Sequence, residues 1–132
     1  MSFLVDTDIC SAYIKQDNAV VGRFVQYGGR LSISTVALGE LRAWALRASA
    51  SPRRVQALGG LLAQVSVLPV DENVAERFGE VRAWQLDRGL ATPDLDLLNG
   101  AVALTHGLTL STHNTQDYLY VPGLRLVDWL AP

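Results

Sequence analysis

Five short apolar segments, separated by stretches with helical patterning, constrain the fold of this chain more than any other feature. They lie at residues 2–6, 30–34, 65–70, 108–112 and 124–128, and each is rich in Val, Leu or Ile. Apolar runs of this length are typical of parallel strands that are buried on both faces. Strands that alternate with helices predict one parallel sheet covered on both sides. We therefore expect an α/β fold with three layers, α/β/α, and a parallel sheet of about five strands.

Local signals mark where the intervening helices begin and end. Capping residues and prolines open helices at Ser51-Pro52, Asp71 and Thr92-Pro93, and glycines close two of them at Gly89 and Gly107. Two more helices are expected in "DNAVVGRFVQYG" and "STVALGELRAWALRA". No repeat, linker or low-complexity segment interrupts this order.

Composition narrows the class of protein. A chain of 132 residues with 49% hydrophobic side chains predicts a single domain, residues 1–132, with a sizeable core. No apolar run is long enough to span a bilayer, and no signal peptide is recognisable. Cys10 is the only cysteine, which fits a cytoplasmic protein. The net charge of -2 excludes general polyanion binding, so nucleic acid would be contacted by local arginines.

Acidic residues follow the first apolar segment directly, in "FLVDTD". Asp6 is expected as the last residue of the strand and Asp8 at the start of a helix. In open parallel sheets, ligands bind at the carboxyl ends of the strands, where this cluster would lie. Simpler interpretations are a turn residue for Asp6 and a helix N-cap for Asp8.

Other acids recur at comparable positions. Glu40 is the only acid in "VALGELRAWAL" and borders its predicted buried stripe, although an ordinary surface glutamate is also possible. Asp94 and Asp96 open a later helix, where capping or the helix dipole explains one of them more readily than both. The loop after the fourth strand, "STHNTQDY", adds Asn114 and Asp117.

Converging carboxylates repel one another, and a divalent cation relieves that repulsion. The candidate ligands are all oxygen donors without a Cys/His set, which favours Mg²⁺, with Mn²⁺ as a substitute, over zinc. A site of this kind suits phosphodiester hydrolysis, because the metal lowers the pKa of bound water and stabilises growing negative charge.

Two families share an apolar strand that ends in Asp-x-Asp. Haloacid-dehalogenase-like phosphatases match "DTDIC" in both acids and "LSIS" in a strand ending in a hydroxyl. They also require a later lysine, and this chain has none beyond Lys15.

The chain resembles the PIN-domain ribonucleases, and among them the VapC-type toxins of bacterial type II toxin–antitoxin (VapBC) pairs. "FLVDTDICSAYIK" is similar to their "LLDTNIxSxxLK", and "LSISTVALGELRAWA" to "ISxxTxxEL". The most specific stretch is "DLDLLNGAVALTHGLTLSTHNTQDYLYVPGLRLVDWL", which matches "DLLIAAxALxxGLTLVTxNTxxFxxVPGLxxxxW". The resemblance covers almost the whole chain.

The resemblance implies a metal-dependent endoribonuclease that cuts structured RNA such as tRNA or ribosomal RNA. By position, Asp6, Glu40 and Asp96 correspond to the acidic triad, with Asp117 as a possible fourth acid. Asp6 and Asp96 would be the main metal ligands. Glu40 would hold the metal through water or position the nucleophile.

Three departures from the family pattern bear on the site. Asp8 stands where asparagine is usual, Asp94 where the family often has an uncharged residue, and Asn99 where an apolar residue is common. Further contacts to the site or the substrate are expected from these and from other polar neighbours: Thr7, Asp8, Ser11, Asp94, Asn99, Thr112 and Asn114.

The resemblance also implies partners: RNA, a VapB-type antitoxin that covers the acidic cleft, and a second copy of the chain in a homodimer. Leu41, Trp44 and Leu46 are candidates for an apolar groove that receives the antitoxin. A catalytically inactive PIN-fold module that binds protein or RNA remains the alternative from another class, and no membrane partner is expected.

Overall fold

The alternation of strands and helices produces the expected three layers in the computed structural model, which describes residues 1–132. The strands are β1 (Phe3–Val5), β2 (Leu31–Ser34), β3 (Ser66–Leu68), β4 (Thr109–Ser111) and β5 (Leu126–Val127). They form one parallel sheet in the order β3-β2-β1-β4-β5. All five predicted strands are present, and the fold class is confirmed.

Helices separate the strands as predicted. They are α1 (Thr7–Ile14), α2 (Asn18–Gln26), α3 (Thr35–Ala45), α4 (Arg53–Leu62), α5 (Glu72–Asp87) and α6 (Asp94–His106), with a 3₁₀ helix η1 at Thr115–Tyr118. Gly89 and Gly107 follow α5 and α6 with φ of 67° and 65°, the left-handed conformation that glycine adopts without steric cost. Every helix in this structure is too short or too polar to pass through a lipid bilayer.

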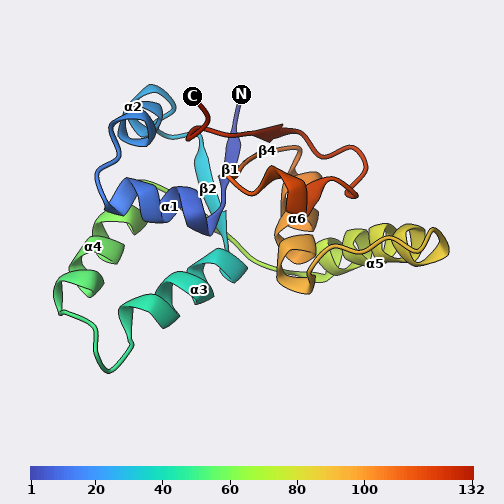
Figure 1. Cartoon of the computed structure of the whole chain (residues 1–132), viewed down its shortest axis with the longest axis horizontal. Helices are drawn as coiled ribbons and strands as arrows, with labels where there is room; N and C mark the ends of the chain where they lie inside the picture. The colour runs from blue at the N-terminus through green and yellow to red at the C-terminus, as the bar shows by residue number, and fades with distance from the viewer.

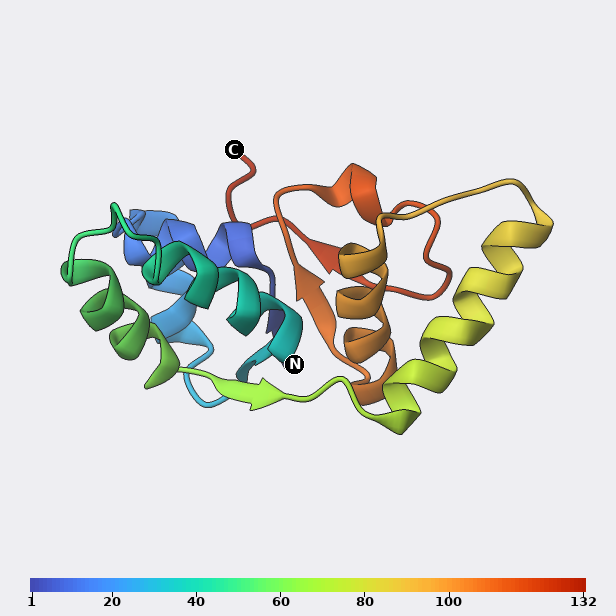
Figure 2. The ribbon, with the colours of Figure 1, turned by 90° about the horizontal axis from the view of Figure 1, so that it is seen from below.

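The two faces of the sheet carry separate cores. Phe3 and Val5 of β1 pack on one side with buried residues of α1 to α4, whereas Leu4 packs on the other with α5 and α6. This alternation is the two-residue period of a strand. Figures 1 and 2 show α1 to α4 on one side of the sheet and α5 and α6 on the other.

The central position of β1 decides where functional side chains meet. It lies between β2 and β4, and the backbone N–H of Asp6 still donates to the carbonyl of Ser111, 2.9 Å away. β1 ends at Val5, and Asp6 is the N-cap of α1 rather than the last strand residue. A sharp strand-to-helix turn therefore presents the Asp6 side chain at the carboxyl edge of the sheet.

Candidate active site

Asp6 lies at the centre of a polar network at the carboxyl edge of the sheet. Its Oδ1 accepts hydrogen bonds from the backbone N–H of Thr7 at 2.8 Å and from Asn99 Nδ2 at 3.3 Å. Its Oδ2 accepts from Thr112 Oγ1 and from the Tyr118 hydroxyl, both at 2.9 Å. Asn99 and Thr112, both candidates from the sequence, are therefore in direct contact with Asp6.

Tyr118 joins the first and third acids. Its hydroxyl lies 2.9 Å from Asp6 Oδ2 and 3.5 Å from Asp96 Oδ1, so the two carboxylates are neighbours. Burial, followed by the charge of Asp6, raises the pKa of Tyr118 well above its ordinary value. The hydroxyl is therefore protonated and acts as a hydrogen-bond donor between two acceptors.

Asp96 is affected by the convergence of acids. Burial is the main cause that raises its pKa from 3.8 to about 6, and the charges of Asp6, Asp117 and Glu40 add to it. The hydrogen bond from Tyr118 opposes this shift. The charges of three carboxylates, from the β1–α1 turn, α3 and η1, thus act on Asp96 at the start of α6, as expected for converging like charges.

Glu40 and Asp117 lie on the exposed side of this acidic cluster, which comprises Asp6, Glu40, Asp96 and Asp117. Glu40 Oε1 accepts a hydrogen bond from Thr7 Oγ1 at 2.7 Å, which links α3 to the first turn of α1. Asp117 is exposed in η1. Thr7 therefore holds two of the acids, Asp6 through its backbone and Glu40 through its side chain.

Asn99 is a buried polar residue with partners on both sides. It is 2% exposed, its Oδ1 accepts from Ser34 Oγ at 2.6 Å, and its Nδ2 donates to Asp6. Ser34 also caps α3, because its Oγ accepts from the backbone N–H of Ala37. A buried amide with satisfied hydrogen bonds fixes the relative position of β2, α6 and Asp6.

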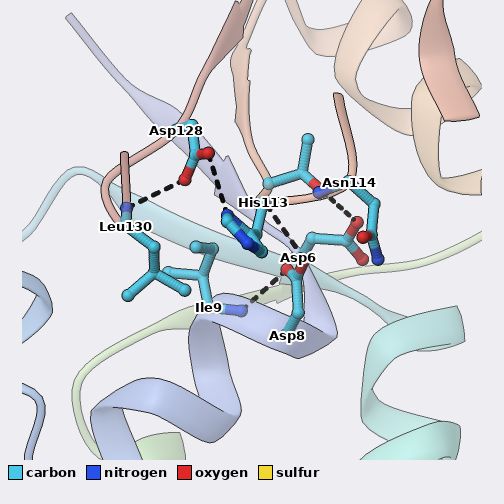
Figure 3. A network of polar contacts seen from close by, with 8 residues as sticks. Asp6, Asp8, Ile9, His113, Asn114, Asp128 and Leu130 are labelled. Carbon is cyan, nitrogen blue, oxygen red and sulfur yellow. Dashed lines mark hydrogen bonds and ion pairs between the residues drawn. The ribbon is translucent and has the colours of Figure 1, made fainter. Parts of the chain in front are cut away.

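Asp8 does not cap α1; that position belongs to Asp6. Its Oδ2 accepts from the backbone N–H of His113 at 3.0 Å, and its Oδ1 from that of Ile9. Burial, and then the charge of Asp6, raise the pKa of Asp8. His113 Nδ1 lies 2.9 Å from Asp128 Oδ2, so Asp8, His113 and Asp128 tie α1 to the loop after β4 and to the C-terminal segment (Figure 3).

Asp94, Ser11 and Asn114 form no side-chain hydrogen bond to the acidic cluster. The N-cap of α6 is Pro93, without a side-chain cap, and the Asp94 carboxylate forms a salt bridge with Arg82 at 2.9 Å instead. Ser11 makes no hydrogen bond to an acid and lines a surface hollow of about 180 Å³. Asn114 contributes its backbone N–H, which donates to Thr112 Oγ1 at 3.2 Å.

The donor set of the acidic cluster fits a divalent cation. None of the four acids is in an ion pair, because the salt bridges of the chain are Arg82–Asp94 and His113–Asp128. No group of three or more His, Cys, Asp or Glu side chains is arranged to hold a metal ion as it stands. Mg²⁺, however, keeps several waters and often takes only one or two protein carboxylates. Asp6 and Asp96, bridged by one hydroxyl, could supply such a pair.

Tyr118 and Ser34 contact the site but were not predicted to belong to it. Ser34 was expected only as a strand residue, and the hydroxyl of Tyr118 lies where the family pattern "NTxxF" has phenylalanine. That single difference was a usable signal, because a hydroxyl added to a buried ring needs a hydrogen-bond partner.

The chain is similar in sequence to members of a known protein family. The PIN domain family model matches residues 3–120. The tRNA(fMet)-specific endonuclease VapC of Shigella flexneri is 32% identical over 130 residues, with 98% of each chain covered. A protein of the same description from Salmonella typhimurium is 28% identical over 130 residues, again with 98% of each chain covered.

Solved structures share the fold. A chain of the DNA-bound VapBC crystal structure from Salmonella typhimurium superimposes with a TM-score of 0.91 and 28% identity, and 98% of both chains is covered. A chain of VapBC2 from Rickettsia felis, bound to a DNA fragment from their promoter, gives 0.90 at 23% identity, covering 98% of this chain and 99% of that one. This chain and the two solved structures thus share the three-layer architecture.

Proposed function

Because the chain belongs to the PIN domain family, and within it to the VapC proteins, we propose that it is a metal-dependent endoribonuclease, the toxin of a toxin–antitoxin pair. The observation that carries this proposal is the acidic cluster, in which Asp6 and Asp96 share one hydroxyl and no basic side chain neutralises them. Residues 1–132 would act as one PIN domain, and we propose the cytoplasm, where tRNA and ribosomal RNA are found, as the site of its activity.

Asp6 and Asp96 would hold Mg²⁺, with Mn²⁺ as a substitute. When bound, the cation lowers the pKa of a water molecule and offsets negative charge that grows on the phosphate. Glu40, held by Thr7, would orient the attacking water, and Asp117 at the exposed rim would assist as the fourth acid. The contacts from Thr112 and Asn99 keep the Asp6 carboxylate in one orientation, which is the positioning that metal ligands require.

RNA is the proposed substrate, and tRNA is the first candidate because the relatives from Shigella flexneri and Salmonella typhimurium are described as tRNA(fMet)-specific. Arginines supply most of the positive charge, since 10 of the 11 basic residues are Arg and the other is Lys15. They are the groups that would contact the phosphate backbone. Mapping the cleaved RNA ends in cells after induction would identify the substrate.

The decisive experiment compares Asp96→Asn with Asp94→Asn in cleavage of purified tRNA and ribosomal RNA with Mg²⁺ or Mn²⁺. Both substitutions remove one charge from the first turn of α6, but only Asp96 shares the Tyr118 hydroxyl with Asp6. We expect Asp96→Asn to lose about a hundredfold or more in rate, as for groups that stabilise transition-state charge. Asp94→Asn should stay within about twofold. Absence of any cleavage by the unsubstituted chain would instead support the inactive PIN-fold module.

A VapB-type antitoxin is the proposed partner, as in the VapBC complexes that share this fold, and a homodimer is the proposed assembly. The unpaired acidic cluster would accept an arginine from the antitoxin, which would neutralise it and exclude metal and RNA. Leu46, which directly follows the helix carrying Glu40, is 70% exposed, and Leu95, beside Asp96 in α6, is 53% exposed. Leu41, expected in the groove, is buried at 1%. Co-expression with the antitoxin should restore growth and yield a stable complex by size exclusion.

A further inference from the structure

The Asp6 carboxylate has no free hydrogen-bond acceptor site. Each carboxylate oxygen offers two lone pairs. Those of Oδ1 receive the Thr7 N–H and Asn99 Nδ2, and those of Oδ2 receive the hydroxyls of Thr112 and Tyr118. A cation that binds Asp6 must therefore take the place of one of these four donors.

Three of the four donors are held by other parts of the structure. The Thr7 N–H belongs to the first turn of α1, and Asn99 is fixed by its 2.6 Å hydrogen bond with Ser34. Thr112 Oγ1 also accepts the backbone N–H of Asn114. The hydroxyl of Tyr118, in contrast, donates only to the two acids, and the one other group in hydrogen-bond contact with it is the Asn99 side chain.

The Tyr118 hydroxyl also differs from the other donors in position. It is the only one that reaches both proposed metal ligands, at 2.9 Å from Asp6 Oδ2 and 3.5 Å from Asp96 Oδ1. A cation bound by both carboxylates would need the same space, because Mg²⁺–oxygen bonds are about 2.1 Å long. The ring itself is 2% exposed and packed beside Val121 and Leu124 near Gly100, so the hydroxyl has a fixed anchor.

We propose that the Tyr118 hydroxyl competes with the divalent cation for Asp6 and Asp96, and that metal binding displaces it. Tyr118 is thus a positioning residue that bridges the two carboxylates until the cation takes over that role. The inference rests on the proposed metal site. Its consequence is a weaker affinity for metal than the same carboxylates would have beside a phenylalanine.

The test is Mn²⁺ affinity, measured by isothermal titration calorimetry and by electron paramagnetic resonance of free Mn²⁺, on Tyr118→Phe. Removal of a donor to a charged acceptor should tighten Mn²⁺ binding about tenfold. Tyr120→Phe is the matched control, because Tyr120 lies two residues on, is 46% exposed, and uses only its backbone carbonyl in a hydrogen bond. The Mn²⁺ affinity of the Tyr120→Phe variant should stay within about twofold of that of the unsubstituted chain. Circular dichroism verifies that both variants are folded.

Thr112→Val separates competition from a general loss of donors. This substitution also frees a lone pair of Asp6 Oδ2, but not one shared with Asp96. Equal tightening by Thr112→Val and Tyr118→Phe would overturn the proposal, as would unchanged or weaker Mn²⁺ binding by Tyr118→Phe. If the unsubstituted chain binds Mn²⁺ and the Tyr118→Phe variant binds it no more tightly, only this inference fails. If no variant binds Mn²⁺, the proposed metal site fails with it.

Discussion

The negative charge of Asp96 destabilises the folded protein. Burial and three neighbouring acids raise the pKa of its carboxyl from 3.8 to about 6, and the Tyr118 hydroxyl compensates only in part. Near neutral pH the folded protein must hold this charge, whereas the unfolded chain holds it in water. Functional groups commonly reduce stability in this way.

The pH dependence of stability follows from that shift. Between about pH 4 and pH 6 the folded state binds a proton at Asp96 more tightly than the unfolded state does. The contribution of Asp96 to stability is therefore full at low pH and is lost as the pH rises through about 6. Asp96→Asn should melt at a higher temperature than the unsubstituted chain at pH 7, with the difference shrinking toward pH 4.

Thermal denaturation in EDTA, from pH 4 to pH 7, measures this difference. Asp94→Asn serves as control, because its carboxylate is 87% exposed and paired with Arg82, an arrangement that contributes about 0–1 kcal/mol. Parallel pH profiles for Asp96→Asn and the unsubstituted chain would contradict the prediction.

At the scale of elements, a buried amide joins α5 to the segment that leads into α6. Gln85 is fully buried, and its Nε2 donates to Thr92 Oγ1 at 2.9 Å and to the carbonyl of Tyr120 at 2.8 Å. Its Oε1 accepts from Arg82 Nη1 at 2.9 Å. One side chain thus connects α5, the segment that precedes α6 and the loop that follows Tyr118.

Gln85→Met should destabilise the protein by roughly 1–3 kcal/mol, the cost of leaving buried polar groups without partners. The methionine fills similar space but cannot satisfy Thr92 or the Tyr120 carbonyl. Urea denaturation measures the effect. Gln26→Met, at an exposed position of α2, should change the free energy of unfolding by less than about 0.5 kcal/mol. Similar values for the two variants would show that the Gln85 contacts contribute little.

These connections also mark the limit of prediction from sequence. The five strands and the ends of α5 and α6 were predictable, because apolar runs, Asp71, Gly89 and Gly107 act locally. The convergence of the acids was predictable from strand ends and from the family resemblance. Contacts between residues far apart in sequence were not: Tyr118 meets Asp6, and Gln85 meets Tyr120, only after the layers pack. Capping, one of the explanations open for Asp94 and Asp96, is not seen: the N-cap of α6 is Pro93, and Asp94 pairs with Arg82 on α5.

The whole molecule consists of two apolar cores divided by one sheet, and the C-terminus closes the first of them. Trp129 is 5% exposed and lies among Phe3, Phe24 and Tyr27, with ring centroids 5.1, 6.3 and 6.0 Å away. Trp129 therefore anchors the C-terminal segment on the first core. Asp128, next to it, accepts from His113, so the same segment reaches the candidate active site.

Trp129→Ala should cost about 3–5 kcal/mol of stability, the usual range when a large buried aromatic is truncated. Leu46→Ala, at a side chain that is 70% exposed, should cost less than about 0.5 kcal/mol. Equilibrium unfolding in guanidinium chloride measures both. A loss below about 1 kcal/mol for Trp129→Ala would mean that the C-terminal segment is dispensable to the first core.

The rate at which Cys10 is labelled by a thiol reagent would report local opening of the protein around α1. The only thiol of the chain is fully buried in α1, four residues after Asp6, and burial followed by the charges of Asp6 and Asp8 raises its pKa far above the ordinary value. A thiol reagent needs an accessible thiolate, so it can react only while α1 is lifted from the sheet. Labelling should be slow, and slower still with Mn²⁺, because a ligand of the folded state suppresses opening. Mass spectrometry of a timed labelling series would read out how often the strand-to-helix turn at Asp6 comes apart; prompt, metal-independent labelling would mean that this turn is not kept closed.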